Sequence, residues 1–414
     1  MTFRGPALAL LIGVCALAQV EPVRTLTLED ALLLAEQNNP RLRVASAAVQ
    51  GAQGAIVTAK ARLNPTFTFG SVGRQQAILA NAPAGTLHGF TFNQPVEVPS
   101  ARATRIRVAE IGRQSSQYAL NETSLAVRGS VKLAFYEALR RKREVEVASG
   151  NLQLLEDLRR RIAVQVKVGE AARLELTRAE AEVAAGRIQV QSAELRRSAA
   201  LAGLSAAVGA PLGNVDPEGT LDPPAILPVI EVLRSQVMAA HPAIALAESE
   251  TRRAAAMVDQ QRAQRIPQPT LWADMFRQPD VAQYRYGISV DLPLWNRREG
   301  PIAEAVAAQR QSAAVAEQRR IEITTALERA YSMYRVAGQQ LEIFEAGTLR
   351  QAEAALQAAE AAFRFGERSI MEVLDAQRVL RSARLDYLNA QFDRQQALIE
   401  LEQLRAVAPG GGRP

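Results

Sequence analysis

Apolar residues recur along residues 302–365 at alternating intervals of four and three. The series comprises Ile302, Val306, Ala313, Ala316, Ile323, Leu327, Ala330, Tyr334, Ala337, Leu341, Phe344, Ala355, Ala358, Ala362 and Phe365, and only Gln309, Arg320, Thr348 and Gln351 interrupt it. A heptad series of this length predicts a long helix with a continuous coiled-coil seam, and its alanines allow a second helix to approach closely. The series alone also fits an ordinary coiled-coil rod.

The same order of elements occurs twice, at an offset of about 200 residues. Asn39-Pro40 corresponds to His241-Pro242, and Val96-Glu97-Val98-Pro99 corresponds to Val290-Asp291-Leu292-Pro293. Each copy predicts a helix, two strands, a very long helix, a turn and a returning helix. The expected helices cover residues 27–61, 101–166 and 172–208 in the first copy and 228–265, 301–364 and 369–406 in the second. At 1.5 Å per residue the middle helix is roughly 100 Å long, so it can pack beside the two shorter helices stacked end to end.

Four segments, 66–76, 87–98, 269–278 and 283–294, have the alternation of strands. In the last one, Tyr284, Tyr286, Ile288, Val290, Leu292 and Leu294 share one face, and Gln283, Arg285, Gly287, Ser289 and Asp291 share the other. The other three are noisier, with Phe67/Phe69, Phe90/Phe92 and Trp272/Phe276 in alternation. An apolar outer face opposite a polar inner face is the pattern of a membrane β-barrel, although two soluble hairpins remain an alternative. Because four strands cannot close a barrel and open edges cannot lie in lipid, several chains must share one; three copies would supply twelve strands.

The two ends of the chain show different patterns. Arg4 precedes an apolar run over residues 6–17, and Ala16-Leu17-Ala18 fits a signal-peptidase site, so residues 1–18 are expected to be a secretory signal peptide. The chain then consists of a first structural repeat over 19–215, a second over 216–408, and a Gly- and Pro-rich tail, 409–414, expected to be disordered. The expected fold class is therefore mainly α with a small β part.

Composition argues against several kinds of function. The net charge is +6, but the arginines are scattered among Glu and Gln without a basic block, so nucleic-acid binding is not indicated. Cys15, the one cysteine, falls within the signal peptide, which leaves no thiol for catalysis or metal binding. His88, expected in a hairpin loop, and His241 are the only histidines, and we expect surface or capping roles for both. We therefore expect no catalytic residues, no cofactor and no bound metal ion.

Over nearly its full length the chain resembles the TolC family of outer-membrane efflux proteins. The resemblance depends on the paired repeats, on Leu26-Thr27-Leu28-Glu29-Asp30-Ala31, on Asn39-Pro40, and above all on Phe365-Gly366-Glu367-Arg368-Ser369-Ile370-Met371-Glu372-Val373-Leu374-Asp375-Ala376-Gln377. It implies a homotrimer with a barrel in the outer-membrane lipid of a Gram-negative bacterium and a helical tunnel through the periplasm. A periplasmic adaptor protein and an inner-membrane pump would dock at the far tip.

A finer resemblance is to the heavy-metal branch of this family, which is CzcC- and CusC-like. It depends on Leu292-Pro293-Leu294-Trp295-Asn296-Arg297, followed by Gly300-Pro301-Ile302-Ala303-Glu304-Ala305. The implied function is a passive outer-membrane channel of a tripartite efflux system for small solutes, with heavy-metal cations as one candidate cargo. The exit duct of a type I protein-secretion system and a soluble periplasmic scaffold are the alternatives, and an enzyme is not expected.

The expected working residues lie at the two turns between a long and a returning helix. Gly169 and Gly366 fit helix-ending residues of positive φ. The resemblance implies that they form the adaptor-binding tip together with Val168, Glu170, Phe365 and Glu367, although simple helix capping is the alternative.

Two pairs of charged residues near these turns complete the expected site. Glu372 and Asp375 are three residues apart and share one helix face, where the resemblance places an acidic ring that gates the periplasmic aperture and attracts cations. Glu175 and Arg368 match positions that latch neighbouring helices in the closed channel. Phe363 stands where the family's best-known member has a tyrosine, so a hydroxyl of that latch is missing.

Overall fold

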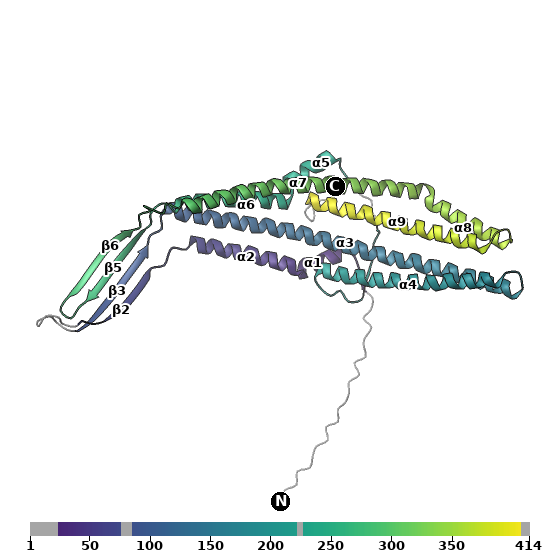
Figure 1. Cartoon of the computed structure of the whole chain (residues 1–414), viewed down its shortest axis with the longest axis horizontal. Helices are drawn as coiled ribbons and strands as arrows, with labels where there is room; N and C mark the ends of the chain where they lie inside the picture. The colour runs from purple at the N-terminus through teal and green to yellow at the C-terminus, as the bar shows by residue number, and fades with distance from the viewer. Residues whose placement is uncertain (1–23, 76–84, 222–226, 407–414) are drawn as a thin grey trace, which may run out of the picture.

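The computed structural model describes residues 24–75, 85–221 and 227–406. The molecule is an elongated rod with a sheet at one end and two helical turns at the other (Figure 1). The expected signal peptide, 1–18, and the expected tail, 409–414, lie outside the described residues.

Both repeats have the expected order of elements. The first contains α1 (Leu28–Asn38), α2 (Pro40–Lys60), β2 (Thr66–Gln75), β3 (Gly85–Pro95), α3 (Pro99–Lys167) and α4 (Arg173–Val208). The second contains α5 (Ile230–Ala240), α6 (Pro242–Ala263), β5 (Pro269–Arg277), β6 (Ala282–Val290), α7 (Glu299–Ile343), α8 (Leu349–Arg364) and α9 (Ile370–Arg405). The prediction of a mainly helical chain with a small β part is confirmed.

The long helices organise the rod. With 69 residues, α3 spans about 100 Å, and it contacts α2 and α4, which follow one another along its length (Figure 1). In the second repeat α7 contacts α6 and α9. The expected packing of a long helix beside a stacked pair is therefore present in both repeats.

A short parallel sheet at mid-length was not predicted. It pairs β1 (Arg24–Leu26) with β4 (Val215–Pro217), so the expected boundary between residues 215 and 216 falls inside a strand. Leu26 and Val215 join a core with Phe135 and Leu139 of α3 and Leu204 of α4. At three residues each, the strands are too short for an alternating pattern to mark them.

The shorter helices at the start of each repeat are divided, so the prediction of single helices over 27–61 and 228–265 was wrong. The breaks fall at Asn39 and His241, which have nearly identical extended backbones and precede a proline. Asn39 Oδ1 accepts a hydrogen bond from the Arg41 backbone N–H at 2.9 Å, and His241 Nδ1 accepts one from the Ala243 N–H at 3.2 Å. The two residues are equivalent N-caps, as the repeat predicts. The hydrogen bond confirms the expected capping role of His241. Its expected surface position is wrong, because the side chain is buried.

This cap should make the stability of the protein depend on pH. Burial lowers the pKa of His241 below its ordinary 6.5, because desolvation disfavours the charged imidazolium. Protonation also removes the lone pair that caps α6. The contribution of His241 to the free energy of unfolding should therefore be constant above about pH 6.5 and fall as the pH drops below that value, by about 1 kcal/mol for a lost cap.

His241→Asn should abolish this dependence, since Asn39 caps the equivalent helix without a titratable group. The measurement is the thermal midpoint of the helical circular dichroism signal at pH 7.5 and pH 5.0. His88 is present in both proteins, so their difference reports on His241 alone. An equal loss of stability in variant and parent would contradict the prediction.

The predicted heptad seam contains every buried residue of α7, although its Ala313 is exposed, and it is wrong by one residue in α8. Leu327, Ala330, Ala337 and Leu341 are the buried residues of α7. In α8 the buried residues are Ala352 and Leu356, whereas the seam positions one residue earlier, Ala355 and the interrupting Gln351, are exposed. A π-helical turn, Phe344–Thr348, lies between the two helices, and Figure 1 shows a bend there. A π turn adds one residue to a helix, which accounts for the shift and for the division of the expected 301–364 helix.

The four long strands form one antiparallel sheet in the order β2-β3-β5-β6. Its register places apolar residues in rows across the sheet, namely Phe69, Phe90, Met275 and Tyr284 in one row and Phe67, Phe92, Ala273 and Tyr286 in the next. The adjacent row on the other face is Thr68, Thr91, Asp274 and Arg285. On one face of the sheet, two central rows are therefore apolar across all four strands, as expected for a membrane barrel, whereas His88 and Arg277 lie on the same face nearer the hairpin ends.

Three details of the predicted strands need correction. Trp272 and Phe276 lie on the polar face, because their cross-strand partners are Asn93 and Gly89 of β3. The segments expected over 87–98 and 283–294 end earlier, at Pro95 and Val290. Pro95, the last residue of β3, has no backbone N–H to continue the ladder. His88 lies within β3, opposite Arg277, and not in a loop.

Candidate functional site at the helical tips

The two turns at the far end of the rod have the same backbone geometry. Val168 and Phe365 end their helices with φ near −90°, and Gly169 and Gly366 follow with φ of 82° and 74°. The N–H groups of Glu170 and Glu367 then donate to the carbonyls of Gln165 and Ala362 at 2.9 and 3.0 Å. These bonds define a Schellman motif, so the expected positive φ at both glycines is confirmed.

Each turn presents an apolar side chain to solvent. Val168 is 64 % exposed and Phe365 is 82 % exposed, at equivalent positions of the two repeats. A Cβ added at Gly169 or Gly366 would meet no atom within 4 Å, so the glycines serve the turn and not a close contact within the chain. An exposed aromatic residue on a rigid turn is suited to insertion into a partner.

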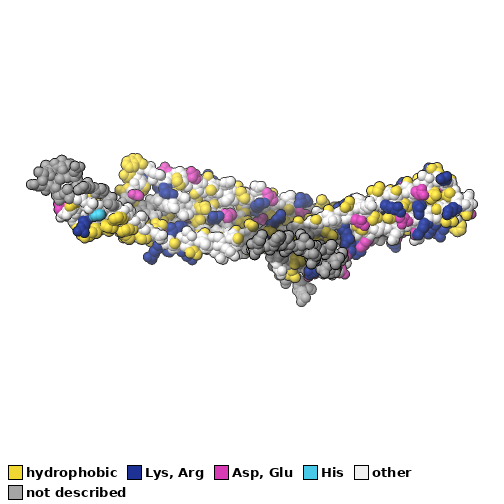
Figure 2. All heavy atoms as spheres, turned by 90° about the horizontal axis from the view of Figure 1, so that it is seen from below, with side chains coloured by type: hydrophobic (Ala, Val, Ile, Leu, Met, Phe, Trp, Pro, Cys, Tyr) yellow, Lys and Arg dark blue, Asp and Glu magenta, His cyan; other side chains and the backbone are white. Residues whose placement is uncertain are grey.

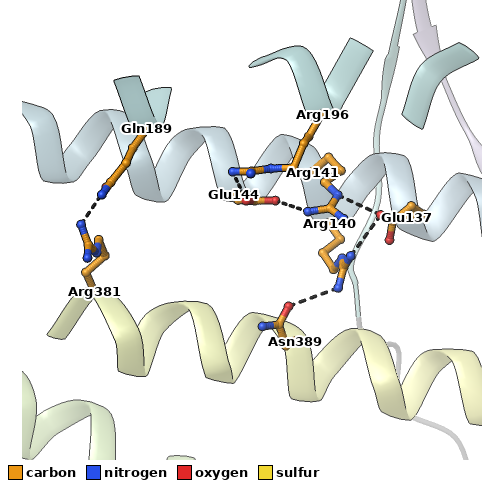
Figure 3. A network of polar contacts seen from close by, with 8 residues as sticks. All are labelled: Glu137, Arg140, Arg141, Glu144, Gln189, Arg196, Arg381 and Asn389. Atoms are coloured by element: carbon orange, nitrogen blue, oxygen red, sulfur yellow. Dashed lines mark hydrogen bonds and ion pairs between the residues drawn. The ribbon is translucent and has the colours of Figure 1, made fainter. Parts of the chain in front are cut away.

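A four-helix core holds the two turns side by side. It contains Leu155, Leu158 and Ile162 of α3, Ala179 and Val183 of α4, Ala352 and Leu356 of α8, and Ile370, Val373, Leu374 and Leu380 of α9. An ion pair between Glu182 and Arg378 joins α4 to α9. Arg381 also donates to Gln189 Oε1 at 2.7 Å, and Figure 3 shows this bond. The tips of the two repeats are thereby fixed relative to each other.

Further along the rod, a polar network joins α3, α4 and α9. Arg141 bridges Glu137 and Glu144 at 2.8 and 2.6 Å, and Arg196 of α4 pairs with Glu144 at 2.7 Å. Arg140 donates to Glu137 and to Asn389 of α9 (Figure 3). This network explains why charged residues can occupy the middle of a helical bundle, since each charge has an opposite partner.

The expected gate residues lie on the first turns of α9. Glu372 and Asp375 are exposed, while Val373 and Leu374 between them are buried in the four-helix core. The buried pair fixes the rotation of α9 and so directs both carboxylates away from the core of the protomer. This common face is the one that the sequence predicts.

Arg368, two residues before the start of α9, has a partner on the first turn of that helix. Its Nη1 lies 3.3 Å from Glu372 Oε1, and both side chains are about half exposed. Glu175 lies in the first turn of α4. The latch between Glu175 and Arg368 would join helices of neighbouring copies and stays a prediction. The Arg368–Glu372 pair adds a link to the expected gate that was not predicted from the sequence, because Arg368 lies before the helix, where helical spacing does not predict neighbours.

Other kinds of site find no support in the described part of the chain. Within residues 24–75, 85–221 and 227–406, no three His, Cys, Asp or Glu side chains are grouped as they would be to hold a metal ion. Among these same residues, no helix has the length and apolar character needed to cross a bilayer.

Known proteins match this architecture over nearly its whole length. Residues 31–210 and 233–406 match the family model described as outer membrane efflux protein. The cobalt-zinc-cadmium resistance protein CzcC of Cupriavidus metallidurans is 26% identical over 93% of this chain and 91% of its own length. The pyoverdine export outer membrane protein OpmQ of Pseudomonas putida is 26% identical over 93% and 86%.

Solved channels share the fold. CusC superposes with a TM-score of 0.80 at 18% identity, covering 91% of each chain. VceC of Vibrio cholerae superposes with a TM-score of 0.77 at 18% identity, covering 92% of this chain and 96% of its own. The chain therefore belongs to the outer membrane efflux protein family, as a channel of the outer membrane that extends into the periplasm.

Proposed function

We propose that three copies of this chain form one conduit, with a shared barrel of twelve strands in the outer membrane. The observation that carries the proposal is the four-stranded sheet, which has two central rows of apolar residues across one face and has β2 and β6 as its edge strands. Unpaired edges are not tolerated in lipid, and three copies of four strands close a barrel wide enough for a lumen.

An exposed apolar stripe on α4 supports the trimer. Ala179, Val183, Gly186 and Ala193 of this helix are buried within the protomer. On another face Leu174, Ile188 and Leu195, spaced by seven or fourteen residues, are 58, 67 and 72 % exposed. Residues seven apart share one helix face, so these three side chains form an apolar stripe on α4 that the described part of the protomer leaves exposed. A helix of a neighbouring copy is the partner that this stripe fits.

The test of the trimer is the mass of the detergent-solubilised protein from isolated outer membranes, measured by light scattering corrected for detergent. The proposal requires three copies in that fraction. A monomer or dimer recovered from the soluble periplasm would refute it and favour the scaffold alternative.

We infer that the cargo consists of heavy-metal cations. An inner-membrane pump would deliver them, and a periplasmic adaptor would bind Val168, Phe365 and the turns around them. CzcC, a resistance protein for cobalt, zinc and cadmium, and an acidic pair at the aperture support this inference. The pyoverdine exporters have about the same sequence identity to this chain as CzcC does, and they favour siderophores as the cargo instead.

Deletion of the gene in its own host tests the metal cargo. It should lower tolerance to Zn²⁺, Co²⁺ or Cd²⁺. Normal tolerance with impaired siderophore or protein secretion would exclude the metal cargo.

We predict that Arg368→Glu makes the tip leaky. The change replaces the 3.3 Å ion pair with Glu372 by a repulsion, next to Asp375 and repeated in three copies. An exposed pair contributes only about 0–1 kcal/mol, so a measurable effect requires this threefold repetition around one aperture. Single-channel conductance in planar bilayers should rise.

Arg364→Glu is the control for this prediction. Arg364 is exposed at the same tip, and its Nε donates to the Glu360 carbonyl and not to a gate carboxylate. Equal conductance of the Arg368 variant and the parent would exclude a gating role for this pair.

A further inference from the structure

The segment between β6 and α7 is longer than its counterpart in the first repeat. There, Val96-Glu97-Val98-Pro99 leads directly into α3, which begins at Pro99. In the second repeat Val290-Asp291-Leu292-Pro293 is followed by residues 294–298 before α7 begins at Glu299. The first repeat therefore shows that the strand-to-helix turn does not need these added residues.

The added segment carries apolar side chains that the described residues of the protomer leave uncovered. Trp295 is 94 % exposed, Leu292 66 % and Leu294 60 %. Figure 2 shows hydrophobic side chains gathered at the sheet end of the molecule. Large apolar side chains that lie together in the open mark a surface with a partner.

Hydrogen bonds hold this exposed segment in a defined shape. The Leu294 N–H donates to the Leu292 carbonyl at 2.9 Å, and the Arg298 N–H donates to Asn296 Oδ1 at 3.0 Å. Arg298 has a left-handed backbone with φ of 59°, and its Nη2 donates to Gln261 Oε1 of α6 at 2.8 Å. A non-glycine residue in this region is strained and persists where its surroundings hold it, often at functional sites. The segment between β6 and α7 therefore has a defined conformation.

The position of the segment indicates which partner it meets. Along β6, the exposed side chains of Tyr284, Tyr286 and Ile288 share the face that we place in lipid, and Leu292 follows them in the chain. Nine tilted residues span an apolar band of roughly 25 Å, so the segment after Val290 lies at the periplasmic boundary of the membrane. Tryptophan favours this boundary, because its ring is apolar and its N–H can bond to water or a headgroup.

We propose that residues 292–297 anchor each protomer in the phospholipid headgroups of the periplasmic leaflet. Leu292, Leu294 and Trp295 enter the boundary between headgroups and acyl chains, and the exposed Arg297 pairs with a lipid phosphate. The anchor fixes the height of the channel in the membrane where the barrel meets the helical rod. The proposed anchor rests on the proposed membrane barrel, and the experiment below distinguishes failure of the anchor from failure of the barrel.

Fluorescence of a single tryptophan tests the anchor. The chain has two tryptophans, so Trp272→Phe leaves Trp295 as the only reporter. The purified protein is reconstituted into vesicles of phosphatidylethanolamine and phosphatidylglycerol whose acyl chains carry bromine either near the headgroup or near the chain end. Bromine near the headgroup should reduce the emission of Trp295 more than bromine near the chain end. Aqueous acrylamide should quench it less than it quenches free tryptophan.

Two outcomes overturn the anchor. Full quenching by acrylamide without quenching by bromine would place the segment in water. Protection from both quenchers would place Trp295 against a neighbouring copy. The control is Tyr286→Trp in a background with Trp272→Phe and Trp295→Phe, which should be quenched best by the deep bromine. Failure of this control would refute the membrane barrel itself, whereas its success with an unquenched Trp295 would refute only the anchor.

Discussion

Tyr286→Arg should prevent the chain from inserting into the outer membrane. Tyr286 is 88 % exposed at the middle of β6, in the apolar row with Ala273 and Phe92. A charged side chain facing lipid at the bilayer midplane costs about 2–4 kcal/mol, and three protomers would each bear this cost. Fractionation should find the variant depleted from the outer membrane and enriched in periplasmic aggregates or degradation products.

Ser289→Arg is the matched control, because it adds the same charge on the opposite face of the same strand. That face already carries Arg285, whose Nη2 pairs with Asp274 at 3.3 Å. If this face lines a water-filled lumen, the control should remain in the outer membrane at parental levels with altered conductance. Loss of both variants would indicate a general sensitivity of β6, and retention of both would place the apolar face outside lipid.

The periodic parts of this fold were predictable because burial repeats along them. Alternation identified four strands, and heptad spacing identified the buried face of α7 as far as Leu341. One inserted residue in the π turn then moved every later buried position in α8, and Gly347 within that turn gave no signal in advance. A periodic pattern predicts packing only while the helix keeps one geometry.

Features that depend on contacts between distant segments were not predictable in this way. Strands β1 and β4 pair over three residues each, and only their shared burial against Phe135 reveals them. The aromatic alternation of Trp272 and Phe276 indicated a strand correctly but gave the wrong face, since register decides which face is apolar. The glycines of the tips were found because they precede a matched acidic residue in both repeats, whereas Gly209 has no such mark.

Gly209→Ala should be among the most destabilising small substitutions in the chain. Gly209 ends α4 with φ of 82°, and a Cβ there would lie 2.7 Å from Pro40 Cδ and 2.9 Å from Asn39 Cα. These atoms belong to the turn that starts α2, and Asn39 Nδ2 also donates to the Ala207 carbonyl at 2.9 Å. The substitution would therefore separate the two helices that stack end to end beside α3.

Gly169→Ala distinguishes this contact from backbone strain. Gly169 has the same φ of 82°, but a Cβ there meets nothing within 4 Å. The left-handed backbone should cost each variant about 1–2 kcal/mol. The steric contact should cost Gly209→Ala roughly 1–3 kcal/mol more. The free energy of unfolding, followed by helical circular dichroism in detergent with urea, measures the difference. Equal losses would mean that the turn at Asn39 can move aside, and that the stacking of α2 on α4 is looser than the close contact at Gly209 requires.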